Sequence, residues 1–383
     1  MTGHIRRRGE RSWELKFDLG TAPTTGERLT RYHSFKGTKR EAQAELTRLM
    51  AAAGDGNYVD ASKATVAEYL DRWEQDWAAI NVSPKTLERY RELLRNHVRP
   101  NLGAIRLQKL RPVDLSELYA KLLRERPGAS SLAPRTVGHV HRVLHKALVV
   151  AVEWGLIQQN PAVLTKAPSV TSPEIEILSE AETMTVLRKL RGRSLYPIIA
   201  LAIASGMRRG ELLALMWKNV DLDGARLRVE HSLEQTKAGL RVKPPKTRHG
   251  RRTISLPAWV VSDLREHWRA QQELRLKLGL GKAPENALVF PNLDGDPRSP
   301  NAITKEWTVA AAKLGFRRVT LHALRHTHAS QLIASGLDVL TISRRLGHGS
   351  PTITLGVYGH LFTNTDDRAA QIMEAAFARA TTE

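Results

Sequence analysis

The residues that could do chemistry in this sequence gather between positions 205 and 360, in four short segments rich in arginine, lysine and histidine. The first segment is Ser205-Gly-Met-Arg-Arg-Gly-Glu-Leu-Leu-Ala-Leu215. Ser205 and Gly206 interrupt an apolar helix just before Arg208, and Glu211 follows on the same helical face. A guanidinium at a helix start, held by a carboxylate, suits the binding of a phosphate. Taken alone the signal is weak, because arginine–glutamate pairs are common on protein surfaces.

The second segment is a basic turn, Pro244-Pro-Lys-Thr-Arg-His-Gly-Arg-Arg-Thr-Ile-Ser-Leu256. We expect it to connect two strands and to present four cations, which are Lys246, Arg248, Arg251 and Arg252. By itself such a turn indicates a loop that grips a DNA backbone without chemistry.

The third segment, Leu321-His-Ala-Leu-Arg-His-Thr-His328, places His322 and Arg325 three residues apart, so that they share one face of a helix. His322 and His326 also have the i, i+4 spacing of helical zinc ligands. No glutamate follows His322 as the hydrolytic zinc motif requires, and a guanidinium beside a dication would be repelled. Metal binding is therefore the weaker interpretation.

The fourth segment runs from Leu346 through Gly-His-Gly-Ser-Pro-Thr-Ile-Thr-Leu-Gly-Val-Tyr-Gly to His360. His348 lies in a glycine-rich turn, and Tyr358 follows between Gly356 and Gly359. A tyrosine among glycines can be exposed and mobile, as a nucleophile must be, although a single tyrosine is far more often structural.

The composition of the chain favours a polyanionic partner. Its 383 residues carry 59 Lys and Arg against 39 Asp and Glu, a formal charge of +20. Neutralising phosphates releases condensed counterions, so such an excess indicates nucleic acid, DNA or RNA alike. There is no cysteine and no apolar run long enough for a membrane span, and the first residues lack the apolar segment of a secretory signal. We expect a soluble, cytoplasmic protein.

The elements that must position these segments change along the chain. Alternating runs at 12–19 and 29–35, followed by a helix that Thr38 can cap, predict a small three-stranded sheet with one helix. From residue 65 to 160 the pattern is helical, with helix starts at Ser83-Pro84, Pro112 and Pro134. A proline-punctuated linker precedes an α-rich region, which Ser179 opens with a capping box.

Within that last region, period-two alternation between residues 226 and 256 predicts a small sheet inserted among helices. The expected fold is mainly α with small β-sheets (α+β), in three domains. Residues 1–55 form the first, 64–162 a helical bundle, and 174–383 the α-rich domain that carries the four segments.

Together the four segments supply Arg208, Lys246, His322, Arg325, His348 and Tyr358. The combined pattern GMRRGELLAL, KT, HALRH and LGHGSPTITLGVYGH resembles the tyrosine recombinase (phage integrase) family over essentially the whole chain. The resemblance implies an arm-type DNA-binding domain first, then a core-binding SAM-like domain, then the catalytic domain.

The resemblance also implies the roles of these residues. Tyr358 is the nucleophile that forms a 3′-phosphotyrosyl link to DNA, and Arg208 and Arg325 hold the phosphate. His348 adds a hydrogen bond, and His322 is the candidate acceptor of the phenolic proton. Lys246 matches the β-hairpin lysine that protonates the leaving oxygen, with Lys243 as the alternative.

The implied reaction needs no cofactor and no metal, because the phosphotyrosine conserves the energy of the broken bond. The implied partners are double-stranded attachment-site DNA and three further copies of the chain, joined through a C-terminal tail at Asp366–Thr382. Accessory DNA-bending or directionality proteins are also compatible. The main alternative function is a DNA-binding protein without catalysis, and a metal-dependent nuclease is the third.

Overall fold

The computed structural model describes residues 3–21, 26–55, 58–124, 131–170, 175–245 and 247–361, together with four single residues nearer the C-terminus. The chain divides into two compact units, Met1–Ser172 and Pro173–Glu383, and each is described by itself.

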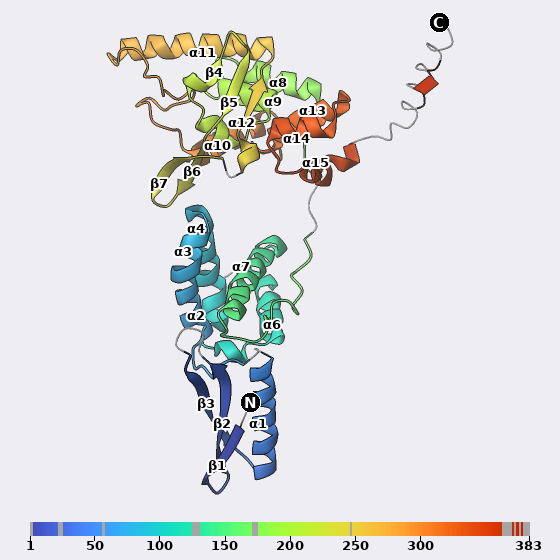
Figure 1. Ribbon diagram of the computed structural model, residues 1–383. Helices are drawn as coiled ribbons and strands as arrows, with labels where there is room; N and C mark the ends of the chain where they lie inside the picture. The colour runs from blue at the N-terminus through green and yellow to red at the C-terminus, as the bar shows by residue number, and fades with distance from the viewer. Residues whose placement is uncertain are drawn as a thin grey trace. The chain divides into compact units, whose positions relative to one another are not determined.

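The first unit begins with an antiparallel sheet, covered on one face by a helix (Figure 1). The strands, β1 Gly3–Gly9, β2 Ser12–Thr21 and β3 Arg28–Lys36, pair in the order β1-β2-β3, and α1 spans Lys39–Gly54. The alternation of β2 buries Leu15 and Phe17 against Leu46 and Leu49 of α1. Thr38 caps α1 in a capping box with Glu41. The predicted sheet with one helix is confirmed.

The rest of the first unit is a helical bundle. Its elements are α2 Val66–Trp73, the π-helical turn η1 Glu74–Ala78, α3 Ala79–Asn81, α4 Pro84–Leu93, the π-helical turn η2 Leu94–Val98, α5 Arg99–Leu102, α6 Pro112–Leu123 and α7 Pro134–Glu153. Ser83 caps α4, with Pro84 in its first position as the sequence predicted. Trp73 is fully buried, and its ring lies 5.6 Å from that of Trp77 and 5.8 Å from that of Tyr90.

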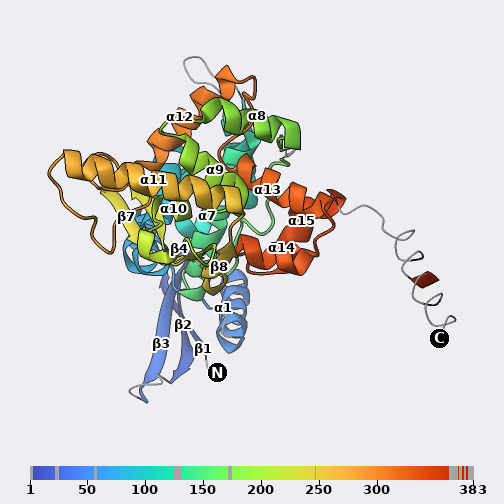
Figure 2. The ribbon, with the colours of Figure 1, turned by 90° about the horizontal axis from the view of Figure 1, so that it is seen from above.

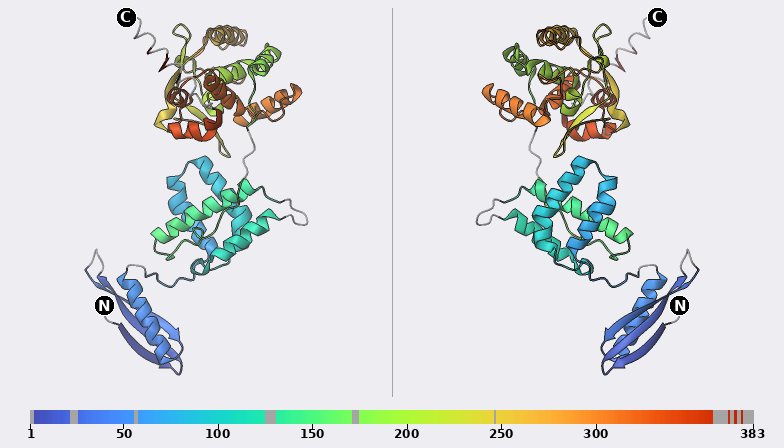
Figure 3. Two further views of the ribbon diagram at one scale, coloured as in Figure 1. Left: turned by 90° about the vertical axis from the view of Figure 1, so that its right-hand side faces the viewer. Right: turned by 90° about the vertical axis from the view of Figure 1, so that its left-hand side faces the viewer.

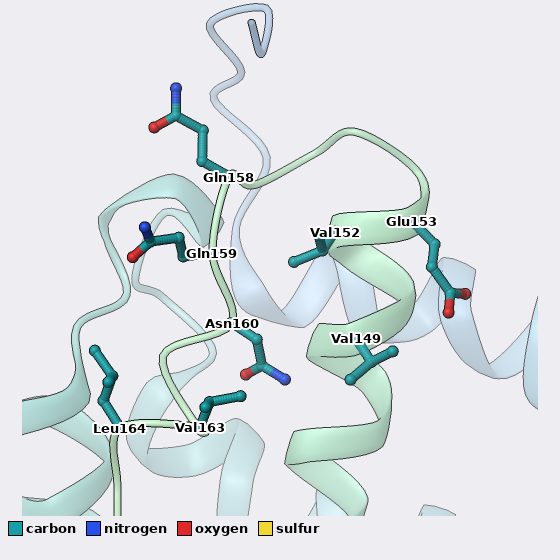
Figure 4. Close-up of a pocket in the computed structure, with 8 residues that line it drawn as sticks. All are labelled: Val149, Val152, Glu153, Gln158, Gln159, Asn160, Val163 and Leu164. Atoms are coloured by element: carbon teal, nitrogen blue, oxygen red, sulfur yellow. The ribbon is translucent and has the colours of Figure 1, made fainter. Parts of the chain in front are cut away.

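A cavity of about 380 Å³ opens in this bundle between the end of α7 and the segment that follows it (Figure 4). Val149 and Val152 line it from α7, and Val163 and Leu164 line it from the following segment. None of the residues that line this cavity belongs to the four basic segments between positions 205 and 360.

The second unit contains all four segments that carry the candidate catalytic residues. Its helices are α8 Glu180–Leu190, α9 Tyr196–Ser205, α10 Arg209–Leu213, α11 Ala258–Lys277, α12 Pro300–Lys313, α13 Ala323–Ala334, α14 Val339–Leu346 and α15 Pro351–Tyr358. Its strands are β4 Val220–Asp221, β5 Arg226–Val229, β6 Ser232–Thr236, β7 Gly239–Lys243 and β8 Arg252–Ser255. They form the sheet β4-β5-β8 and the hairpin β6-β7.

Helix α9 is the centre of this unit. It is apolar along its whole length, and α8, α10, α11 and α13 pack around it (Figure 2). Helices α13, α14 and α15 follow one another as neighbours, as the views of Figure 3 also show. A second, smaller apolar cluster lies between these last three helices and contains Ala329, Ile333, Ile342, Leu346 and Tyr358.

The predicted fold class, mainly α with small antiparallel sheets, is confirmed. The finer division into three domains remains a prediction. Among the described residues there are three larger apolar clusters, which contain Phe17, Trp73 and Trp307, and the smaller one with Tyr358. The contacts between residues nevertheless divide the chain into two compact units. Among the described residues, no helix has the length and apolar character to cross a membrane.

The packing of α12 predicts a large loss of stability for Trp307→Ala. Trp307 is fully buried, and its Nε1 donates to the carbonyl of Val319 at 2.9 Å. We expect the variant to lose about 3–5 kcal/mol of the free energy of unfolding, measured by urea denaturation. Val309→Ala on the same helix, where the side chain is 50% exposed, should change it by less than about 0.5 kcal/mol. Equal losses in the two variants would contradict this packing.

Candidate active site

Arg208 is positioned by a sharp helix end. Helix α9 stops at Gly206, whose φ of 64° is left-handed and whose Cα faces the ring of His328 too closely for any side chain. Arg208 then caps α10, with its backbone N–H and its Nη1 both donating to Glu211 at 2.9 Å. Its Nη2 donates to the carbonyl of Gly347 at 3.2 Å. Arg208 is therefore tied both to its own helix and to the turn that carries His348.

Arg325, on α13, is buried and 3% exposed. Its Nη1 donates to the carbonyl of Gly206 and its Nη2 to the carbonyl of Leu346, both at 2.7 Å. One guanidinium thus joins the turn before Arg208 to the turn before His348. Burial, reinforced by the charge of Arg208, lowers the pKa of Arg325 to about 9, so the group stays charged at neutral pH. Among the described residues it forms no ion pair.

Glu211 is the buried anion beneath these cations, and it is 3% exposed. Arg252 donates from β8 to its Oε2 at 2.8 Å, the same oxygen that accepts from the backbone N–H of Arg208. Burial alone would raise the pKa of Glu211, but the bonds and charges of Arg252 and Arg208 bring it below its usual value. Arg252 also donates to the carbonyls of Gly250 and Arg345, which ties the basic turn to α14.

The two predicted histidines lie close to the arginines. The Nδ1 of His348 lies 2.8 Å from the hydroxyl of Thr354. Burial and the charges of Arg325, Arg208 and Arg252 lower the pKa of His348 to about 4. His322 immediately precedes α13, and burial followed by the charges of Arg325 and Arg208 lowers its pKa. Both imidazoles are therefore neutral at physiological pH.

Tyr358 differs from the expectation of an exposed, mobile side chain. It is the last residue of α15 and is only 3% exposed, packed in the cluster between α13, α14 and α15. The exposure that glycine neighbours allow is absent here, because a glycine beside a residue does not determine which neighbouring helix covers its ring. Burial raises the pKa of Tyr358 to about 12, against the opposing charge of Arg325.

The hydroxyl of Tyr358 lies 2.7 Å from the Nδ1 of His326, one helical turn along α13 from His322. From the sequence, His326 was considered only as a metal ligand. Among the described side chains, no three His, Asp or Glu residues group as metal ligands do.

Lys246 lies outside the described residues. The alternative, Lys243, lies at the end of β7 and is paired with the half-buried Glu234 of β6.

Two further residues, His328 and Arg345, support the site without having been singled out for it. The Nδ1 of His328 lies 2.8 Å from the carbonyl oxygen of Ile203, and Arg345 donates to its Nε2 at 3.0 Å. Arg345 also donates to the carbonyls of Ala204 and Ser255. These contacts join α9, β8, α13 and α14. In the sequence, His328 ends the third segment and Arg345 directly precedes the fourth, and nothing else marks either residue for this role.

Comparison with known proteins identifies the family of the chain. Residues 173–365 match the model of the phage integrase family, and residues 65–123 match that of the phage integrase N-terminal SAM-like domain. Fold and matches together define a tyrosine-type site-specific recombinase. More narrowly, the chain belongs to the phage integrase family.

An integrase of Streptomyces ambofaciens is 29% identical over 96% of this chain and 94% of its own length. The Tn1549 transposon integrase, solved with transposon right end DNA, is 22% identical and has a TM-score of 0.66 over 82% of this chain and 99% of that one. Lambda integrase, solved as a tetramer on a Holliday junction, is 20% identical, with a TM-score of 0.54 over 91% of this chain and 96% of that one. The two structures show that the fold is shared.

The buried ion pair predicts a strong response to Arg252→Met. This variant leaves Glu211 with one of its two cations, so we expect a loss of about 3 kcal/mol in the free energy of unfolding. Adding Glu211→Gln should recover part of it, with a coupling of roughly 0.5–3 kcal/mol in a double-mutant cycle measured by urea denaturation. Arg265→Met, which breaks the exposed pair with Asp223, should cost less than about 1 kcal/mol. Additive losses at Glu211 and Arg252 would argue against the pair.

The lowered pKa of Glu211 also predicts a pH dependence. Because the folded pKa lies below the ~4.3 of a free glutamate, the ionised carboxylate contributes its full stabilisation above that pH. The contribution is lost as the pH falls through the lowered pKa. The difference in unfolding free energy between the parent chain and Glu211→Gln should therefore be constant near neutrality and shrink in acid. A difference that grows in acid would contradict the assignment.

Proposed function

We propose that this integrase inserts a phage or other mobile element into bacterial DNA, using Tyr358 as the nucleophile. The phenolic oxygen attacks phosphorus, a 3′-phosphotyrosyl bond forms, and the bond to the 5′ oxygen breaks. The 5′-hydroxyl of a second duplex then reverses the step on a new strand. The observation that carries this assignment is that Arg208, Arg325, His348 and Tyr358, which come from three of the four segments, lie near one another around the turns at Gly206 and Leu346.

The two arginines are proposed to hold the scissile phosphate. A guanidinium has five N–H donors. The bonds described above occupy two N–H groups of Arg325, and three remain for phosphate oxygens. Phosphoryl transfer asks mainly for alignment and charge stabilisation, which preorganised cations in a water-poor site supply. The bond of His348 to Thr354 leaves Nε2 as the nitrogen that we assign to a phosphate oxygen.

Proton movements complete the proposed reaction. His322, neutral at physiological pH, is assigned as the acceptor of the phenolic proton, and Lys246 as the donor to the leaving 5′ oxygen. The ion pair of Lys243 with Glu234 supports Lys246 over Lys243, because it holds the ammonium of Lys243 against the neighbouring strand β6.

The proposed partners are attachment-site DNA and further copies of the chain. The charge of +20 and a cavity of about 480 Å³ lined by Arg228, Arg251 and Arg252 support binding to a phosphate backbone. The tetramer of lambda integrase supports a homo-tetramer on DNA. The tail proposed to join its protomers, Asp366–Thr382, lies outside the described residues apart from Ala370, Met373, Glu374 and Phe377. We assign the protein to the bacterial cytoplasm, on the nucleoid when it binds DNA.

The test of the function is covalent capture of a suicide substrate, a nicked attachment site from which the cleaved end diffuses away. We expect the parent chain to form a protein–DNA adduct that maps to Tyr358. Tyr358→Phe should form none while retaining its DNA affinity. Arg208→Ala and Arg325→Ala should slow capture by roughly 2–4 kcal/mol of lost stabilisation. If the parent chain binds the attachment-site DNA but never forms an adduct, the result favours the alternative function, a DNA-binding protein without catalysis.

The role of Lys246 has its own test, because a better leaving group needs no proton. Lys246→Ala should cleave a normal phosphodiester at least about 100-fold more slowly than the parent chain, as expected for loss of a general acid. A substrate with sulfur in place of the leaving 5′ oxygen should restore most of that rate. Lys243→Ala serves as the control. If the sulfur substrate restores the rate of Lys243→Ala and not that of Lys246→Ala, Lys243 is the proton donor.

A further inference from the structure

The proposed nucleophile makes a hydrogen bond that its assigned chemistry does not use. The hydroxyl of Tyr358, at the end of α15, lies 2.7 Å from the Nδ1 of His326 on α13. The centroids of the two rings are 5.4 Å apart. The inference drawn here rests on the proposed role of Tyr358 and concerns what fixes its hydroxyl.

The surroundings of His326 keep its imidazole neutral. His322 packs edge-on against it at 4.9 Å between centroids, and Arg325 is its neighbour on α13. Burial, followed by the charges of His322 and Arg325, lowers the pKa of His326 to about 4. A neutral imidazole with its proton on Nε2 has one acceptor, Nδ1, and the phenol donates to it.

Packing fixes the ring of Tyr358 but not its O–H bond. The ring is held among Ala329, Ile333, Ile342 and Leu346, none of which has a side-chain acceptor. Rotation about the C–O bond would otherwise leave the proton and the lone pairs of the attacking oxygen without a fixed direction. Because attack on phosphorus requires aligned orbitals, such freedom slows the reaction.

We propose that His326 is a positioning residue for the nucleophile, whose Nδ1 accepts the phenolic hydrogen and so orients the oxygen of Tyr358 before it attacks. His326 does not itself remove the proton. Before attack the proton stays on the phenol, because the pKa of Tyr358, about 12, lies far above that of His326, about 4. The proton acceptor remains His322, and His326 acts through Tyr358.

Two variants separate orientation from proton transfer. His326→Asn retains an amide that can meet the phenol near the position of Nδ1, but it cannot take up a proton near neutrality. His326→Leu fills similar space and offers no acceptor. The control is Ser330→Ala on the same helix, because the buried hydroxyl of Ser330 has no hydrogen-bond partner among the described residues.

The readouts are single-turnover adduct formation on the suicide substrate, DNA affinity and the thermal midpoint of unfolding. We expect His326→Asn to stay within about 5-fold of the parent rate and His326→Leu to fall by about 30-fold or more at unchanged DNA affinity. Both should keep the pH profile of the parent chain. Ser330→Ala should match the parent chain in all respects.

Two results would overturn the inference. If His326→Asn and His326→Leu slow capture equally, His326 takes up the proton itself. The same conclusion follows if either variant flattens the acid side of the pH profile of capture. If Leu behaves like Ser330→Ala, the hydrogen bond is incidental. If His326→Leu does not fold, His326→Asn alone decides. A rate of capture more than about 30-fold below that of the parent chain would then contradict the inference, because the asparagine retains an acceptor for the phenol. Failure of the parent chain to capture DNA would refute the proposed function instead, which keeps the two failures distinct.

Discussion

The site depends on an excess of buried positive charge. Arg208 and Arg252 share one carboxylate, Glu211, while Arg325 is matched only by the carbonyls of Gly206 and Leu346. Carbonyl dipoles satisfy hydrogen bonds but do not neutralise a charge, and a desolvated cation without a counterion is unfavourable. The lowered pKa of Arg325 expresses this. An anion that binds in the site therefore supplies the counterion that Arg325 lacks. This favours binding of the negatively charged phosphodiester.

The same constraint explains the backbone around the site. For its guanidinium to reach both carbonyls, Arg325 needs two helix ends to turn back toward it. Both α9 and α14 end in a left-handed glycine, with φ values of 64° at Gly206 and 68° at Gly347. A Cβ at Gly347 would meet Arg252 and the carbonyl of His249 at 2.9 Å. The glycines of the motifs are thus required for close approach, in addition to their conformational freedom.

Much of this could be predicted from the sequence because it is local. Helix starts at Thr38, Ser83 and Ser179 follow from side chains that reach three residues along the chain. The pairing of Arg208 with Glu211 follows from helical spacing in the same way. The burial of Tyr358 did not follow, because it depends on where α13 and α14 pack. For the same reason Arg252 was seen as a loop cation, although its alternation on β8 turns it inward to Glu211.

The burial of Tyr358 limits when the nucleophile can lose its proton. The charge of Arg325 favours the phenolate, yet burial outweighs it and raises the pKa of Tyr358 to about 12. A bound phosphate would neutralise the positive charge that favours the phenolate form of Tyr358. Ionisation of the phenol before attack would then be even less favourable. Under the proposed mechanism the proton must therefore leave as the bond to phosphorus forms, when the charge of the oxygen is passing to the phosphate. Neutral His322, the assigned acceptor, suits this timing better than a charged lysine, because a neutral imidazole can take up a proton and an ammonium cannot.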